Sequence, residues 1–169
     1  MADCKPVLTA MATTIKASSA GGVAFSDATK YRSIIGALQY ITLTRPDVAF
    51  SVNRVCQFMH NPSEDHWSMV KRILRYLKHT IKYGLHITKS PSQDLQAFTG
   101  ADWAGYGDDR KSTGGYAFYM GPNLISWASK IQKKVALSST ESKYKALADA
   151  CAKLTWLQSL FGELGLSTA

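Results

Sequence analysis

Three aspartates near the middle of the chain, Asp102, Asp108 and Asp109, could supply oxygen ligands to a cation. Divalent cations such as Mg²⁺ and Ca²⁺ prefer carboxylate oxygens that a short segment brings together. The paired aspartates are followed directly by Arg110 and Lys111. Acids beside basic residues form a solvated turn that neutralises its own charge, so we expect such a turn here rather than a metal site.

A second set of residues carries positive charge at helical spacing. Lys71, Arg75, Lys78 and Lys82 recur every three or four positions, and Arg72 lies beside them. On a helix this spacing gives one basic face, which could follow the phosphate backbone of a nucleic acid without sequence specificity. The alternative is a solvated face whose long side chains cover an apolar core, and both interpretations remain open.

The same segment contains a short peptide motif. Arg72, Ile73, Leu74 and Arg75 resemble the R-x-L-R tetrapeptide of a class of secreted pathogen effectors. Those effectors carry the motif shortly after a signal peptide, and no signal precedes it here. Leu74 also falls on the apolar face of the expected helix, so we favour a chance match.

Composition predicts a globular protein with a basic balance. The 169 residues have a net charge of +8, which favours polyanionic partners, and 46% are hydrophobic. Three widely spaced cysteines, Cys4, Cys56 and Cys151, form neither a disulfide framework nor a zinc motif. With no visible signal peptide and no apolar run of membrane-spanning length, we expect an intracellular protein without a membrane partner. A secreted protein that reaches a host cell is the alternative location if the chain is an effector.

The first half of the chain predicts helices after an irregular start. Residues 1–29 contain Pro6, Gly21 and many threonines and serines, which oppose a regular element and suggest a surface or mobile segment. Residues 30–83 fit three amphipathic helices. We expect Asn61 to cap the third and Gly84 to end it.

The second half predicts strands and one long helix. Short strands are expected at 85–88, 95–98, 115–120 and 124–127, the last continuing towards residue 137. Ser138 and Glu141 form a capping box that opens the helix. Its predicted buried side comprises Tyr144, Leu147, Ala148, Cys151, Leu154, Leu157 and Leu160. The fold class is therefore α+β, with an irregular segment 1–29, a helical region 30–88 and a strand-and-helix domain 89–169.

Several segments resemble copia-type retrotransposon polyproteins. Residues 98–104, Phe-Thr-Gly-Ala-Asp-Trp-Ala, are similar to that family's F-S-D-A-D-W-A-G, and residues 138–147 to its S-S-T-E-A-E-Y-x-A-L. Residues 71–78 look like the part that joins the polymerase to the ribonuclease H. The resemblance implies a reverse-transcriptase connection followed by the N-terminal half of a ribonuclease H domain, with three mainly antiparallel strands and one helix.

The resemblance also implies a chemistry whose residues are changed in this chain. Members of the family cleave RNA in RNA–DNA hybrids with two Mg²⁺ ions held by acidic residues, and two of those acids match Gly100 and Lys143. Asp102, two positions along a strand, could keep the same face as residue 100. Glu141 would face elsewhere on the helix and serve the capping box. We therefore expect a catalytically inactive protein without a metal cofactor.

Three functions remain in view. The first is an inactive ribonuclease H-like fragment that acts by binding, with non-specific nucleic acid or with a protein partner at an open sheet edge. The second is a secreted effector that binds host components and modulates defence or cell death. The third is an active hybrid ribonuclease as part of a larger polyprotein.

Overall fold

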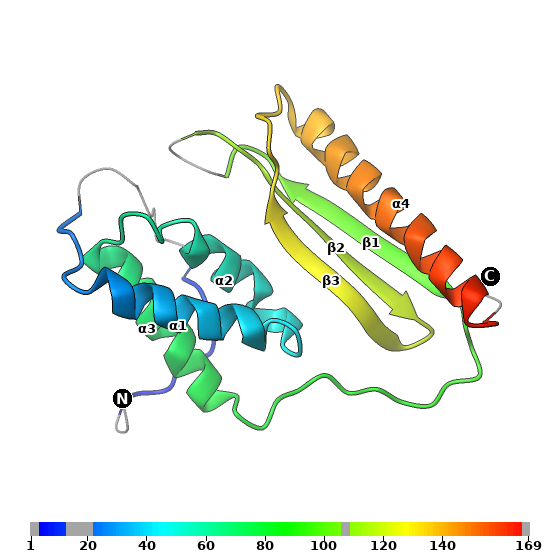
Figure 1. Ribbon diagram of the computed structural model, residues 1–169, viewed down its shortest axis with the longest axis horizontal. Helices are drawn as coiled ribbons and strands as arrows, with labels where there is room; N and C mark the ends of the chain where they lie inside the picture. Colours follow the sequence, from blue (N-terminus) through cyan, green and yellow to red (C-terminus); the bar gives the residue numbers. More distant parts are fainter. Residues whose placement is uncertain (1–3, 13–21, 106–108, 167–169) are drawn as a thin grey trace. The chain divides into compact units, whose positions relative to one another are not determined.

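The computed structural model describes residues 4–12, 22–105 and 109–166, and the fold is mixed α+β, as the sequence predicts (Figure 1). The chain divides into two compact units, Met1–Leu85 and His86–Ala169. Over the described residues, unit 1 contains the helices α1, α2 and α3, and unit 2 contains a three-stranded sheet and the helix α4. None of the described helices is long and apolar enough to cross a membrane.

Unit 1 is built from three helices around one apolar core. They are α1 (Ala28–Ile41), α2 (Ala49–Cys56), which follows a short 3₁₀ turn at Pro46–Val48, and α3 (Glu64–His79). Each helix contributes residues at helical spacing, as its amphipathic pattern predicts. The fully buried members of this core are Tyr31, Ile35, Leu38, Val48, Val52, Val55, Val70 and Ile73.

The ends of α3 differ from the prediction. Ser63, not Asn61, caps the helix: its hydroxyl accepts a hydrogen bond from the His66 N–H, and the His66 ring accepts one from the Ser63 N–H. The helix ends at His79 rather than near Gly84, because Thr80 leaves the helical conformation. Ile81 therefore lies beyond the helix and is 79% exposed.

The described part of the N-terminal segment packs against unit 1. Ala10 is buried, and the ring of Phe25 stacks on Trp67 with 4.8 Å between the ring centroids. Arg72 donates hydrogen bonds to the carbonyl and hydroxyl oxygens of Thr9. These residues therefore lie across the helices, the first of the two predicted alternatives, and Ala10 and Phe25 contribute apolar side chains to the core.

A buried arginine ties the start of α2 to the end of α3. Arg45 makes a two-pronged ion pair with Asp47, at 2.9 and 2.6 Å, and donates to the backbone carbonyl of Thr80 at 3.0 Å. The Tyr76 hydroxyl donates to the same Asp47 carboxylate at 2.8 Å. These bonds to the Arg45 guanidinium and the Tyr76 hydroxyl lower the pKa of Asp47, although its partial burial opposes the shift.

Unit 2 contains an antiparallel sheet with the order β1-β2-β3, formed by β1 (Leu95–Asp102), β2 (Thr113–Met120) and β3 (Asn123–Ile131). Gly121, with φ of +54°, opens the two-residue turn between β2 and β3, where a positive φ suits glycine. Residues 85–88 form no strand, since Thr88 bonds to the side chain of Asn123 instead. Strand β3 stops at Ile131, so the predicted extension to residue 137 is also wrong.

The helix α4 (Ser139–Glu163) covers one face of this sheet (Figure 1). Ser138 caps it by accepting from the Glu141 N–H at 3.1 Å, as predicted, while the Glu141 carboxylate accepts from the Leu137 N–H instead of the Ser138 N–H. The buried face of α4 agrees with the prediction at Leu157, which is buried, and at Leu154, which packs against the core, but the other predicted positions Tyr144, Leu147, Ala148 and Cys151 are exposed. Small residues allow the helix to approach the sheet around Phe118, and the buried positions are Ser142, Ala146, Ala150 and Leu157.

The Arg45–Asp47 pair should stabilise unit 1 in a pH-dependent way. Because the folded pKa of Asp47 is lowered, its contribution is present above the unfolded pKa and is lost as the pH falls through the folded value. We expect Asp47→Asn to cost about 1–3 kcal/mol at pH 7. Urea unfolding at pH 7 and at acidic pH measures this cost. The difference from the unmodified chain should shrink at acidic pH, and Asp65→Asn, an exposed acid on α3, should show a smaller effect.

The orientation of α4, which exposes Cys151, predicts which thiol reacts first. Cys151 is exposed, whereas Cys56 is half-buried and its burial raises the pKa of the thiol. A disulfide reagent should therefore react faster with Cys151 than with Cys56 in the folded chain. In a Cys4→Ser background, which removes the third thiol, Cys151→Ser should remove the fast phase and Cys56→Ser should retain it. A fast phase that survives in Cys151→Ser would contradict the observed orientation of α4.

Candidate functional site

The two positions that the copia resemblance matches to metal ligands lie around one groove of unit 2. Gly100 is on β1 and Lys143 is in the second turn of α4, and both line a groove of about 590 Å³ between these elements. Residues 43 positions apart in the chain are brought together because α4 packs along β1. The remaining lining residues are Thr99, Ala101, Thr140, Tyr144 and Leu147.

The groove carries one positive charge and no carboxylate. Lys143 is exposed and is the charged residue among those that line it. Glu141 does not compensate for it, because its carboxylate pairs with Lys145 at 2.6 Å and accepts from the Leu137 N–H. The bond to Lys145 lowers the pKa of Glu141, so this acid stays ionised and committed to the start of the helix.

Asp102 lies at the end of β1 rather than in the groove. Its side chain folds over the turn that follows, where Ala104 has a φ of +52° and where an added Cβ on Gly105 would overlap the Asp102 carboxylate. Trp103 fixes the same turn by donating from its indole N–H to the Ala136 carbonyl at 3.0 Å. Asp102 is exposed and does not line the groove beside Lys143.

The residues present do not fit a two-metal centre. Across residues 4–12, 22–105 and 109–166, no group of three or more histidines, cysteines, aspartates and glutamates could hold a metal ion. Burial raises the pKa of Asp109, but the bonds that its carboxylate forms with Lys111, including an ion pair at 2.6 Å, together outweigh burial and lower the pKa. That pair forms the self-neutralising turn expected from the sequence, while Asp108 lies outside the described residues.

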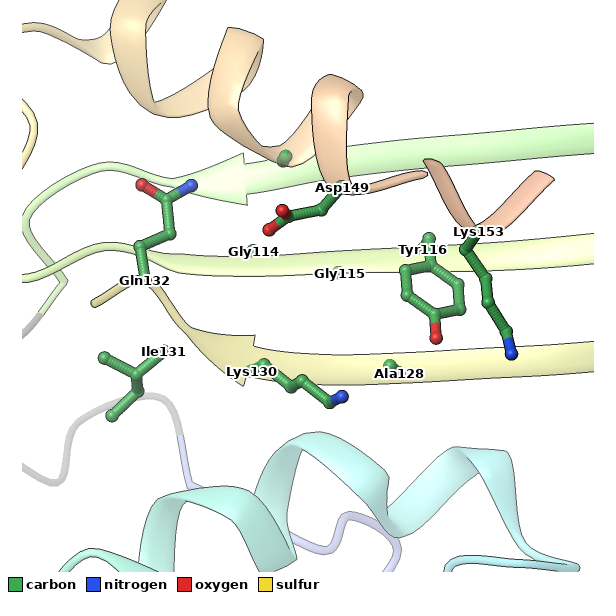
Figure 2. Close-up of a pocket in the computed structure, with 10 residues that line it drawn as sticks. Gly114, Gly115, Tyr116, Ala128, Lys130, Ile131, Gln132, Asp149 and Lys153 are labelled. Atoms are coloured by element: carbon green, nitrogen blue, oxygen red, sulfur yellow. The ribbon is translucent and has the colours of Figure 1, made fainter. Parts of the chain in front are cut away.

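A second cavity lies on the same sheet face, over β2 and β3 (Figure 2). Its volume is about 310 Å³, and it contains the carboxylate of Asp149 with the lysines Lys130 and Lys153. Lys153 also places its ammonium 3.5 Å from the centroid of the Trp156 ring, a cation–π contact. Sequence reasoning missed this cavity, since its residues come from three separate elements and share no motif. Its mixed charges single out no ligand class.

The predicted basic stripe on α3, formed by Lys71, Arg72, Arg75, Lys78 and Lys82, is only partly exposed to solvent. Lys71 and Lys78 are exposed on α3, and Lys82 is exposed beyond the end of the helix. Arg75 is half-buried, and Arg72 is held by its two hydrogen bonds to Thr9. The structure therefore leaves three exposed lysines of the five predicted residues.

The R-x-L-R tetrapeptide is a segment of α3 and not an extended peptide. Arg72 holds Thr9, Ile73 is fully buried, and Leu74 packs against the core. A receptor could bind these residues as an extended linear motif only if the helix unfolded. The geometry therefore supports the interpretation of the tetrapeptide as a chance match.

Comparison with known proteins places the chain among transposon sequences. It is similar to the retrovirus-related Pol polyproteins from transposons RE2 and RE1 of Arabidopsis thaliana, each 47% identical over 98% of this chain. The chain spans 11% of the length of these two polyproteins. No protein-family model and no solved structure matches it.

A shorter protein is similar over most of its own length. The "Secreted RxLR effector protein 161" of Plasmopara viticola is 44% identical over 128 residues, which are 75% of this chain and 90% of that protein.

The charge of the groove predicts its response to metal ions. With one lysine and no carboxylate, the groove should give no saturable binding of Mn²⁺. Thermal unfolding followed over a Mn²⁺ series should show no shift of the midpoint that saturates with metal. A saturating rise that disappears in Asp102→Asn would contradict this prediction and identify Asp102 as a ligand.

Proposed function

We propose that the chain, whose relatives at 47% identity are Pol polyproteins from copia-type retrotransposons, is a ribonuclease H-like fragment that acts by binding and not by catalysis. One observation supports the proposal: a single groove is lined by Gly100 and Lys143, the two positions that the resemblance matches to acids. The order of three antiparallel strands followed by a helix agrees with the first half of the ribonuclease H fold that the resemblance implies.

The physical reason for inactivity is electrostatic. Two divalent cations can approach the same phosphate only when several carboxylates offset their mutual repulsion. A lysine ammonium in the same groove repels a cation instead, and the repulsion grows as the distance between the charges falls. Asp102 and Glu141 do not replace the missing ligands, since neither lines the groove and Glu141 is already paired.

Unit 1 is the better candidate for contact with nucleic acid. Residues 1–85 contain eleven lysines and arginines against five aspartates and glutamates, whereas residues 86–169 contain nine against seven. Lys71, Lys78 and Lys82 are the exposed members of the basic stripe. Contacts of this kind neutralise phosphates without reading the bases, so the affinity should depend on salt and not on sequence.

Unit 2 is the candidate for contact with a protein. Strand β1 is one of the two outer strands of the sheet and pairs with β2 on one side only. Its free edge offers backbone groups to an added strand.

A second candidate function is that of a secreted effector that binds host components. The observation that favours it is the 44% identity to a secreted RxLR effector, which extends over 90% of that protein. This support comes from the whole length of the match and not from Arg72–Arg75, which is folded into α3. Detection of the native protein only inside the producing cells would reject the effector role.

An active ribonuclease within a longer polyprotein is the rival. The chain spans 11% of the transposon polyproteins, whose remaining length could supply acids that this chain lacks.

One experiment separates these functions. Purified chain is incubated with a labelled RNA–DNA hybrid and Mg²⁺ or Mn²⁺ over a salt series. We expect binding that weakens steeply with salt and no cleavage, because unit 1 is basic and the groove lacks ligands. Metal-dependent cleavage would overturn the proposal, and absence of both binding and cleavage would reject the nucleic-acid part of it.

Matched variants test which surface binds. Substituting Lys71, Lys78 and Lys82 with glutamine removes the exposed stripe, and substituting Lys130, Lys133 and Lys134 removes the same charge from unit 2. We expect the first variant to lose more affinity and to show a slope against log salt that is smaller by about two to three. Equal losses in both variants would indicate attraction by net charge alone.

A further inference from the structure

The start of α3 holds a short part of the N-terminal segment through backbone hydrogen bonds. The Glu64 N–H donates to the Val23 carbonyl at 2.9 Å, and the Phe25 N–H donates to the Pro62 carbonyl at 2.9 Å. An antiparallel bridge lies between these two bonds. Residues 22–25 therefore lie beside the start of the helix as one strand lies beside another.

A buried histidine closes the same junction from the helix side. His66 is 2% exposed, and its ring stacks on Phe58 with 3.7 Å between the ring centroids. The ring Nδ1 accepts a hydrogen bond from the Ser63 N–H at 3.0 Å, while the His66 N–H donates to the Ser63 hydroxyl. A ring nitrogen that accepts a hydrogen bond carries no proton, so the imidazole is neutral in this arrangement.

We propose that the pair of bonds between His66 and Ser63 is an acid-sensitive switch: protonation of the ring opens the start of α3 and frees residues 22–25 from it. Each bond of this switch joins two residues of unit 1. Release of the segment would uncover the rings of Tyr31 and Trp67, on which Phe25 packs.

The chemistry of the ring explains why protonation breaks the junction. Both nitrogens of an imidazolium carry hydrogen, so turning the ring over does not restore an acceptor for the Ser63 N–H. Two donors would then face each other at the present distance of 3.0 Å. In addition, a buried charge lacks water, and the positive end of the helix dipole repels a cation in the first turn. The ring therefore gains its proton when the first turn of α3 opens.

The charged groups around the ring leave this penalty in place. Glu64 and Asp65, in the first turn of α3, attract a charged ring, but both are exposed and solvent screens them. Residues 22–25 carry no charge. The titratable side chains of α1, α2 and their flanking residues that pack around this junction are Asp27, Lys30, Tyr31, Arg32, Arg54, Cys56 and His60. Asp27, the acid of this set, is exposed and caps α1.

The sign of the effect gives its pH window. A histidine in an opened or unfolded chain takes up a proton near pH 6.5, at roughly its ordinary pKa. The closed junction is therefore stable above about pH 6.5, and its equilibrium constant falls by up to about tenfold for each pH unit below that value. The contribution of Asp47 is lost at lower pH, because an aspartate ordinarily titrates near about 3.9 and the folded pKa of Asp47 is lower. A comparison of pH 7 with pH 5 thus isolates the histidine.

Amide hydrogen exchange of the full chain, followed by NMR and corrected for the intrinsic rate at each pH, tests the switch. We expect the protection of the Phe25 and Glu64 amides to fall about tenfold or more from pH 7 to pH 5. The Thr80 N–H, which donates to the Tyr76 carbonyl at the other end of α3, should keep its protection. Unchanged protection at Phe25 and Glu64 would overturn the proposal. An equal loss at Thr80 would also overturn it, since unit 1 would then unfold as a whole.

Two substitutions separate the buried histidine from an exposed one. Glutamine at position 66 can accept from the Ser63 N–H, as in a common capping box, and does not titrate. His66→Gln should therefore give the same protection at pH 7 and pH 5. His60→Gln, which changes an exposed histidine after α2, should keep the loss at pH 5. A loss that persists in His66→Gln, or that disappears in His60→Gln, would contradict the assignment to His66.

Nitrogen NMR of the unmodified chain tests the same assignment without a substitution. At pH 7 the Nδ1 of His66 should have the chemical shift of a ring nitrogen without a proton, with the proton on Nε2. A protonated Nδ1 at pH 7 in the folded chain would overturn the proposal, because the ring would then already tolerate the state that is expected to open the junction.

Discussion

One helix cannot cover a three-stranded sheet completely, and the arrangement of unit 2 follows from that constraint. Phe118 on the middle strand is fully buried, and the small residues Ala146 and Ala150 let α4 approach it closely. The helix therefore centres on β1 and β2. The cost is exposure at both sides: a groove along the outer edge of β1, and a cavity over β2 and β3 beside Lys130 (Figure 2).

The same packing explains why the fold tolerates glycine at position 100 and lysine at position 143. Residues 100 and 143 face neither the core around Phe118 nor the capping bonds of α4, so glycine and lysine are accommodated there. An added Cβ on Gly100 would meet nothing within 4 Å, and Lys143 is exposed. The stability of the unit depends on other residues, such as Gln132, whose amide donates to the Ser142 carbonyl beneath the first turn of α4.

Periodicity and capping residues predicted the α+β class, the helix that Ser138 opens and the core of three strands. These local patterns gave the wrong answer where the buried face or the cap of a helix depends on residues elsewhere in the chain. Tyr144, Leu147 and Cys151 form an apolar stripe and were predicted to be buried, yet the sheet takes the neighbouring stripe of small residues because these allow closer packing. Likewise, Ser63 and Asn61 are both residues that favour a helix cap. Ser63 is the cap because it exchanges two hydrogen bonds with His66, one of them to the His66 ring. No local signal could have revealed the cavity beside Asp149.

The error at α4 is informative in itself. A stripe of larger apolar side chains that suggests burial in the sequence lies exposed in unit 2, because the small residues beside it pack on the sheet. Packing against the sheet is therefore decided by how closely a stripe can approach it, and not by the hydrophobicity of that stripe alone.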